Sequence, residues 1–198
     1  MKSIHSKLSP TITNMIRMDH TSVLETFHQY EIDAKPKTKK ALVGTVCLAL
    51  EIHTQLEEEI FYPAMRAVSA DAAVLDKSVP EHNEIRRLIA QLRAMTPTDA
   101  SYDQTFMQLM REVMHHVADE ETSLLPDAER LLAPQLSELG AEMTRRRLEL
   151  AAPRARELAS NAVRGMPASY MLMAAGAVIA GTYFAKRAFQ GGPPTRHH

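Results

Sequence analysis

The chain has 198 residues, with 23 Lys and Arg, 24 Asp and Glu, nine His and one Cys. This length suits one domain of ordinary size, or one domain with an appendage. The formal net charge of −1 argues against a general nucleic-acid binder, which carries a basic excess. The single cysteine, Cys47, excludes an internal disulfide and a thiolate metal cage, so we expect an intracellular protein whose histidines carry the chemistry.

Good helix formers dominate the first 160 residues, and proline or polar clusters interrupt them. The first helix is expected to begin with Ser9 as its N-cap before Pro10. Pro80 either kinks the third helix or marks its start. The apolar spacing predicts helices over about 9–34, 37–67, 71–95 and from the break at 96–99 to about 132. Short connections between four helices predict an all-α, up-down-up-down four-helix bundle over residues 1–133.

A helical extension is expected after the bundle. Residues 134–165 are predicted as a polar helical linker, 166–190 as an apolar C-terminal helix and 191–198 as a disordered tail. Residues 168–185 carry no charge and would span about 27 Å as a helix, close to the hydrocarbon thickness of a bilayer. We therefore favour a single transmembrane anchor that holds the bundle at the cytoplasmic face of a membrane. The alternative is an apolar helix that packs on the bundle or joins a homodimer.

The second and fourth helices share the pattern H-x-x-x-E-E-x-x-x-x-P. It occurs at His53 with Glu57 and, 63 positions later, at His116 with Glu120. The first and third helices repeat as well, because His20 and a later histidine 62 positions on each follow an acidic residue. The chain therefore reads as two helix pairs that together offer six candidate metal ligands: His20, His53, Glu57, His82, His116 and Glu120.

The spacing within the motif has a chemical purpose. Residues i and i+4 are neighbours on one helix face, so each His and Glu pair can approach one metal centre. Two octahedral ions offer twelve positions, of which four imidazole nitrogens and two bridging carboxylates fill eight. A bridging oxo or hydroxo group fills two more and leaves two open for a small ligand. Imidazole with carboxylate suits iron, with zinc or manganese as alternatives. Burial of these carboxylates without a metal would be costly.

The order His, His-x-x-x-Glu, His, His-x-x-x-Glu resembles the hemerythrin-like (HHE cation-binding) domain family over about residues 10–133. The resemblance implies a non-heme di-iron centre held by the six candidate ligands. Oxygen-carrying hemerythrins have a further histidine where this chain has Arg86. The pattern is closer to HHE variants linked to iron, nitric oxide or oxidative stress.

Several residues beside the ligands are assigned supporting roles. Asp19 and Glu81 are predicted to orient ligand histidines by accepting a ring N–H. His115 is a lesser candidate beside the site. Glu58 and Glu121 point away from the ligand direction and are expected to be solvated or to lie just outside the ligands.

The function expected from this sequence is the binding or sensing of O2, NO or peroxide at two bridged iron ions, in iron or oxidative-stress handling. One alternative is a catalase-like or peroxidase-like di-iron enzyme. Another is a membrane adaptor in which the metal is structural. No nucleic-acid partner is expected. The sequence assigns no catalytic residue.

Overall fold

The computed structural model describes residues 10–69 and 73–165 of the chain. Within these ranges the chain is all-helical and contains no strand. The bundle is built from α1 (Ile12–His28), α2 (Pro36–Leu56), α4 (Ala73–Ala94) and α5 (Tyr102–Asp119). The shorter and later elements are η2 (Glu57–Phe61), α3 (Tyr62–Arg66), η3 (Glu120–Leu124), α6 (Leu125–Leu131), α7 (Leu136–Ala151), η4 (Ala152–Arg154) and α8 (Ala155–Gly165).

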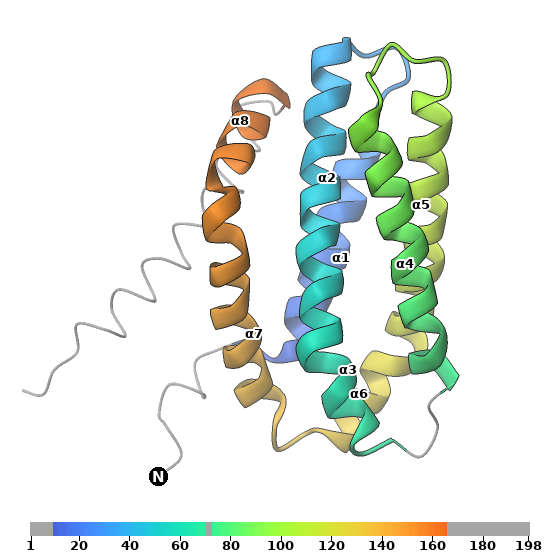
Figure 1. The fold of residues 1–198 in the computed structure, drawn as a ribbon. Helices are drawn as coiled ribbons and strands as arrows, with labels where there is room; N and C mark the ends of the chain where they lie inside the picture. The colour runs from blue at the N-terminus through green and yellow to red at the C-terminus, as the bar shows by residue number, and fades with distance from the viewer. Residues whose placement is uncertain (1–9, 70–72, 166–198) are drawn as a thin grey trace, which may run out of the picture. The chain divides into compact units, whose positions relative to one another are not determined.

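The four long helices lie side by side as a bundle, which confirms the predicted helical fold (Figure 1). Two groups of buried apolar side chains fill it. One contains Val23, Leu50 and Phe106, and the other contains Ile16 and Leu56. On each long helix a histidine stands between the two groups, so the chain places a polar layer inside an apolar core. Its polar groups need ligands or hydrogen bonds there.

The first helix begins and ends differently from the prediction. It starts at Ile12, with the side chain of Thr11 capping the backbone N–H of Asn14, and the expected cap Ser9 lies outside the described residues. The helix ends at His28 instead of near residue 34. Because Pro36 already occupies the first turn of α2, the chain uses residues 29–35 to reverse direction.

Two π-helical turns interrupt the second and fourth predicted helices. The turns η2 and η3 begin at Glu57 and Glu120, the carboxylates of the repeated motif. Each is followed within six residues by a proline, which cannot donate a backbone hydrogen bond, so a wider turn fits the sequence. The helix α4 begins at Ala73, seven residues before Pro80, so Pro80 lies inside the helix and does not mark its start.

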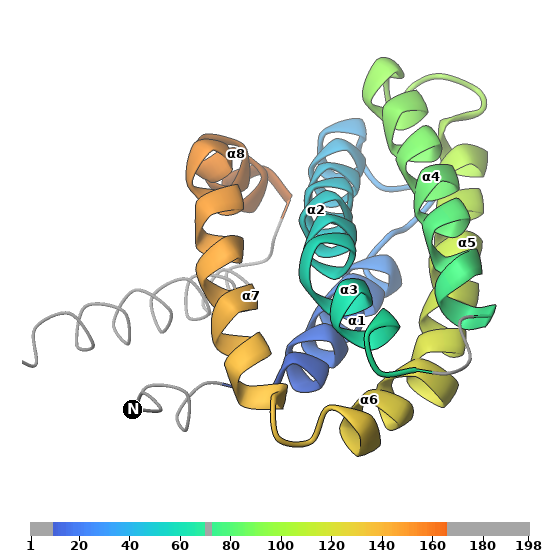
Figure 2. The same cartoon turned by 60° about the horizontal axis from the view of Figure 1, so that its bottom comes forward.

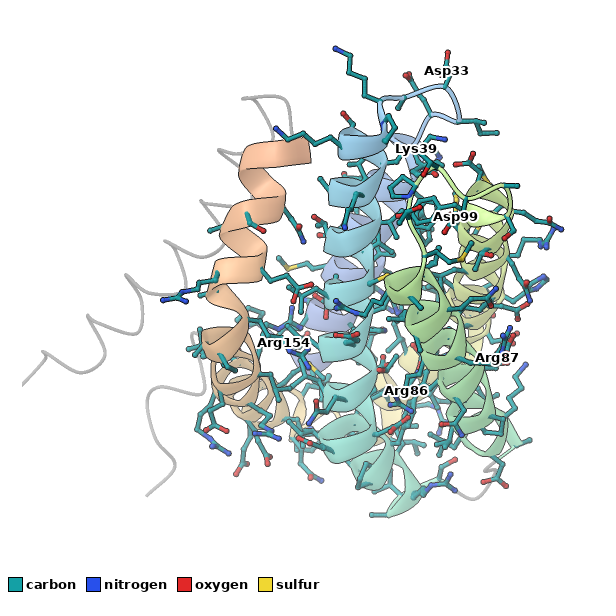
Figure 3. The ribbon with its side chains drawn as sticks, turned by 45° about the horizontal axis from the view of Figure 1, so that its top comes forward. Asp33, Lys39, Arg86, Arg87, Asp99 and Arg154 are labelled. Carbon is teal, nitrogen blue, oxygen red and sulfur yellow. The ribbon has the colours of Figure 1, made fainter. Side chains whose placement is uncertain are left out.

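The polar stretch predicted as a linker forms α7 and α8, and both pack on the bundle. Figure 2 shows α7 beside α1 and α2, and α8 runs along α2. Ion pairs hold this layer. Arg93 of α4 donates to Glu157 of α8 at 3.0 Å. Arg154 of η4, labelled in Figure 3, lies 3.5 Å from Glu51 of α2. The stretch is polar because one side faces solvent and the other meets charged groups of the bundle.

No helix within residues 10–69 and 73–165 combines the length and the apolar character that crossing a membrane requires. The predicted anchor at 168–185 and the predicted tail at 191–198 lie outside the described residues.

Candidate metal centre

The six predicted ligands come together in the polar layer of the bundle. All are buried, and Glu57 and Glu120 have no exposed surface at all. The Nε2 atom of His53 lies 3.2 Å from a Glu57 oxygen, and that of His20 lies 3.3 Å from a Glu120 oxygen. We call His20, His53, Glu57, His82, His116 and Glu120 the His/Glu cluster.

The His/Glu cluster divides into two groups that could each hold a metal ion. The first contains His20, His53, Glu57 and Glu120, and the second contains Glu57, His82 and His116. Within each group, one potential ligand atom from every residue lies within 4.8 Å of the others. Glu57 belongs to both groups, which is the geometry required of a bridging carboxylate.

Four buried atoms of the His/Glu cluster make no hydrogen bond of acceptable geometry with the described residues, although some of them lie 3.2–3.3 Å from a neighbour in the cluster. They are His20 Nε2, His53 Nε2, Glu57 Oε1 and Glu120 Oε2. Buried polar atoms are normally hydrogen-bonded, and an unsatisfied one costs about 1–3 kcal/mol. All four belong to the first group. Nitrogen and carboxylate oxygen atoms gathered in this way fit a metal such as iron, manganese or zinc.

A ring of carboxylates surrounds the His/Glu cluster and faces the other ring nitrogen of each histidine. The Nδ1 atom of His20 lies 2.9 Å from Glu121, and the Nδ1 atom of His53 lies 3.4 Å from Asp19. The Nδ1 atom of His82 lies 2.8 Å from Glu58, and the Nδ1 atom of His116 lies 3.0 Å from Glu81. We call Asp19, Glu58, Glu81 and Glu121 the outer carboxylates. A carboxylate accepts, so Nδ1 carries the proton and Nε2 faces the cluster, which is the tautomer that a metal ligand needs.

The structure thus places Asp19 against His53 and Glu81 against His116, and their predicted role in orienting metal ligands stays a prediction. His115 is exposed and lies about 100° around the helix from His116. Its role beside the site stays a prediction. Glu58 and Glu121 touch His82 and His20 directly. Their position one residue after each motif glutamate, where a π turn changes the helical angle, is the signal that locates them.

The charges of the His/Glu cluster are strongly coupled. Burial raises the pKa of Glu57, but the charge of His53 and hydrogen bonds from His116 and His82 outweigh burial and lower it well below its ordinary value. Burial lowers the pKa of His116, but Glu57, Glu81 and Glu120 outweigh it and raise the pKa to about 10. The metal-free centre therefore holds protons at neutral pH. A metal ion must displace them, so its affinity rises with pH.

Tyr62 is a component of the centre that the sequence pattern does not identify. Its hydroxyl donates to Glu120 at 2.9 Å and lies 3.2 Å from His82 Nε2 and 3.4 Å from Glu57. Burial, followed by the charges of Glu57 and Glu120, raises the pKa of Tyr62, so the hydroxyl keeps its proton. Tyr62 is five residues after Glu57, and the intervening π turn brings both onto one side of the helix.

A small cavity adjoins the opposite side of the cluster. It measures about 10 Å³, room for about one water molecule, and touches His20, His53 and His116. The remainder of its wall is largely apolar, with contributions from Val23, Leu50, Ile85, Val113 and Val117.

Comparisons with known proteins agree with this geometry. The family model of the hemerythrin HHE cation-binding domain matches residues 11–128 and, in a second overlapping match, residues 79–174. The first match covers more than half of the chain, so the chain belongs to this family. Fold and site together define a metal-binding hemerythrin-like protein.

Two individual proteins resemble parts of the chain. A curated protein named DNA nickase, from Nostoc sp. strain PCC 7120, is 30% identical over 118 residues, which are 60% of this chain and 33% of that protein. The chain thus spans about a third of the length of this relative. The crystal structure of a hemerythrin HHE cation-binding domain-containing protein from Mycobacterium kansasii has a TM-score of 0.63 at 17% identity, covering 76% of this chain and 96% of that one. At this identity the likeness concerns the fold.

Proposed function

We propose that the His/Glu cluster holds two iron ions and that the protein binds or senses a small oxygen or nitrogen species such as O2, NO or peroxide. The observation that carries the proposal is the set of four unsatisfied buried atoms that converge in the first group. His20 and His53 would bind one ion through Nε2, and His82 and His116 would bind the other. Glu57 and Glu120 would bridge the two ions.

The surroundings of the cluster favour a small ligand. The cavity beside His20 and His53 has room for about one water molecule and a largely apolar wall. A space of this size suits a small molecule such as O2, NO or peroxide better than a larger substrate. Iron held by these residues would supply electrons and open coordination positions to such a molecule. The outer carboxylates keep the imidazoles oriented, so no ligand has to rotate when the small molecule arrives.

A second candidate function, the decomposition of hydrogen peroxide, is favoured by Tyr62. Two molecules of peroxide would give two of water and one of O2, without an external reductant. This chemistry is assisted by a fixed hydrogen-bond donor beside the reacting oxygen atoms. The Tyr62 hydroxyl, which keeps its proton and donates to Glu120, is such a donor. The activity named for the Nostoc relative is not extended to this chain, because the match covers a third of that protein.

Anaerobic loading with Fe²⁺, followed by iron analysis and optical titration with O2, NO and peroxide, tests the proposal. We expect two iron ions per chain and a change in the visible spectrum with at least one of these ligands. Zinc-loaded protein should give no such change. The variant His116→Ala should lose an ion, whereas the matched variant His115→Ala should behave like the parent. Fewer than about one iron per chain in the parent would contradict the ligand geometry.

A further inference from the structure

Each outer carboxylate also contacts a cationic side chain on its far side. Arg17 donates to Glu121 at 3.1 Å, Arg86 lies 2.8 Å from Glu58, Lys77 lies 4.0 Å from Glu81, and Arg147 donates to Asp19 at 2.5 and 2.6 Å. Every candidate ligand histidine is therefore the first member of a His–carboxylate–cation chain. Three of the four cations stand on bundle helices. Arg147 alone among them comes from α7.

We propose that Arg147 is a positioning residue of the metal centre, which holds His53 in its ligand orientation by fixing Asp19. The inference rests on the proposed function only in requiring that the His/Glu cluster binds metal. It makes the docking of α7 part of the centre, although α7 lies outside the four-helix bundle.

The geometry of Asp19 supports this role. Both of its carboxylate oxygens accept from the two terminal nitrogens of the Arg147 guanidinium, the strongest arrangement available to such a pair. The side chain of Asp19 is only 17% exposed. The Asp19 carboxylate lies 3.4 Å from His53 Nδ1, whereas the other three outer carboxylates lie within 3.0 Å of the Nδ1 atoms of their histidines. Asp19 is therefore held mainly by Arg147, and its hold on His53 depends on where Arg147 places it.

The internal repeat explains why this cation must come from another helix. In the second half of the chain, Lys77 stands one turn before Glu81 on α4 and approaches it within 4.0 Å. The corresponding place one turn before Asp19 on α1 is Met15, which is buried and carries no charge. Thr144 of α7 donates to the sulfur of Met15 at 3.3 Å. Thr144 and Arg147 are three residues apart on one face of α7, so that face supplies the cationic side chain that α1 lacks beside Asp19.

The consequence falls on one of the two metal positions. His53 belongs to the first group, which contains the four unsatisfied atoms and adjoins the apolar cavity. Asp19 itself lines that cavity. Loss of Arg147 should therefore weaken the ion beside the cavity and leave the ion held by His82 and His116 in place.

A pair of matched variants separates positioning from simple docking. Arg146 also ties α7 to the bundle, through Glu59 at 2.7 and 3.0 Å, and neither residue contacts a ligand histidine. Co²⁺ is the probe, because its visible absorption reports the ligands around each ion, and competition with a chelator measures affinity. We expect Arg147→Met to weaken one of two Co²⁺ ions about 10–100-fold and to change its absorption band. Arg146→Met should leave both ions unchanged, and Arg147→Lys should recover part of the affinity.

Further measurements keep the outcomes distinct. If Arg147 acts through Asp19, Asp19→Asn should reproduce the loss, and the double variant should lose little more than either single variant. Urea unfolding of the metal-free proteins should show similar destabilisation in Arg146→Met and Arg147→Met, since each loses one inter-helix ion pair. Equal Co²⁺ binding in these two variants would overturn the positioning role while leaving the proposed function standing. A parent chain that takes up no metal would overturn both.

Discussion

Replacement of Gly140 by alanine should destabilise the protein, although alanine is the better helix former. Gly140 is buried in α7 where that helix crosses the start of α1. A Cβ atom added there would lie 2.0 Å from the carbonyl oxygen of Pro10 and 3.1 Å from the backbone nitrogen of Ile12. Both obstructing atoms belong to the backbone, so no side-chain rotation can relieve the contact. The helix α7 would have to move away from α1 by about 1.5 Å to restore van der Waals separation.

The magnitude follows from what α7 loses by moving. Met143 is 1% exposed in this interface, and burial of a methionine side chain contributes about 1.5–3 kcal/mol. The ion pair between Arg147 and Asp19 adds about 1 kcal/mol, since the guanidinium is partly exposed. The intrinsic preference of alanine over glycine in a helix returns about 1 kcal/mol. We therefore expect Gly140→Ala to lower the free energy of unfolding by about 2 kcal/mol, the balance of these terms.

Urea unfolding of the metal-free protein measures this effect, with Gly44→Ala as the matched control. A Cβ atom at Gly44 would meet the side-chain amide of Asn161 at 2.9 Å, and that amide can swing aside. Gly44→Ala should therefore be neutral or stabilising by up to about 1 kcal/mol. The two substitutions differ in the expected sign of their effect. A Gly140→Ala protein as stable as the parent would refute the close packing of α7 on α1.

Three further outcomes are expected. Tyr62→Phe should keep the metal bound, because Tyr62 is no member of the His/Glu cluster. It should slow peroxide decomposition about 100-fold if the hydroxyl is a hydrogen-bond donor to the reacting oxygen atoms; unchanged turnover would exclude that role. Asp103→Asn should lower the free energy of unfolding by about 2 kcal/mol, because the buried Lys39 ammonium loses its counter-charge at 2.7 Å. Burial raises the pKa of Asp103, but hydrogen bonds from Lys39 and from a tyrosine outweigh it and lower the pKa. The contribution of Asp103 to the free energy of unfolding is thus full above its ordinary pKa and is lost as pH falls through the folded-state pKa. The free energy of unfolding should therefore depend less on pH below about pH 4 in Asp103→Asn than in the parent.

The helical periodicity and the duplicated motif were sufficient to predict the bundle and the gathering of its buried ligands. A histidine and a glutamate four residues apart share a helix face wherever the helix is regular. This spacing predicts that His53 lies beside Glu57 and His116 beside Glu120. Apolar side chains on either side of each histidine indicated that the face is buried.

Other parts of the centre depend on features that a regular helix does not predict. The π turns rotate the chain after Glu57, and this rotation brings Tyr62 into the centre and Glu58 against His82. The contact of Arg147 with Asp19 joins residues 128 positions apart. Such a contact depends on how α7 packs, which local spacing does not encode. The same limitation applies to the polar stretch predicted as a linker, whose charged side chains contact charged side chains of the bundle.

The two halves of the repeat are not copies at the residue that follows each π turn. The first half has Tyr62 there, and the second half has Leu125, which is buried among apolar side chains. The hydroxyl thus stands at one side of the His/Glu cluster, whereas the cavity opens at the other. The duplicated and nearly symmetric bundle is therefore asymmetric at its centre, with a hydroxyl group on one side and a cavity on the other. If the proposed ligand enters from the cavity, the Tyr62 hydroxyl would face it from the opposite side.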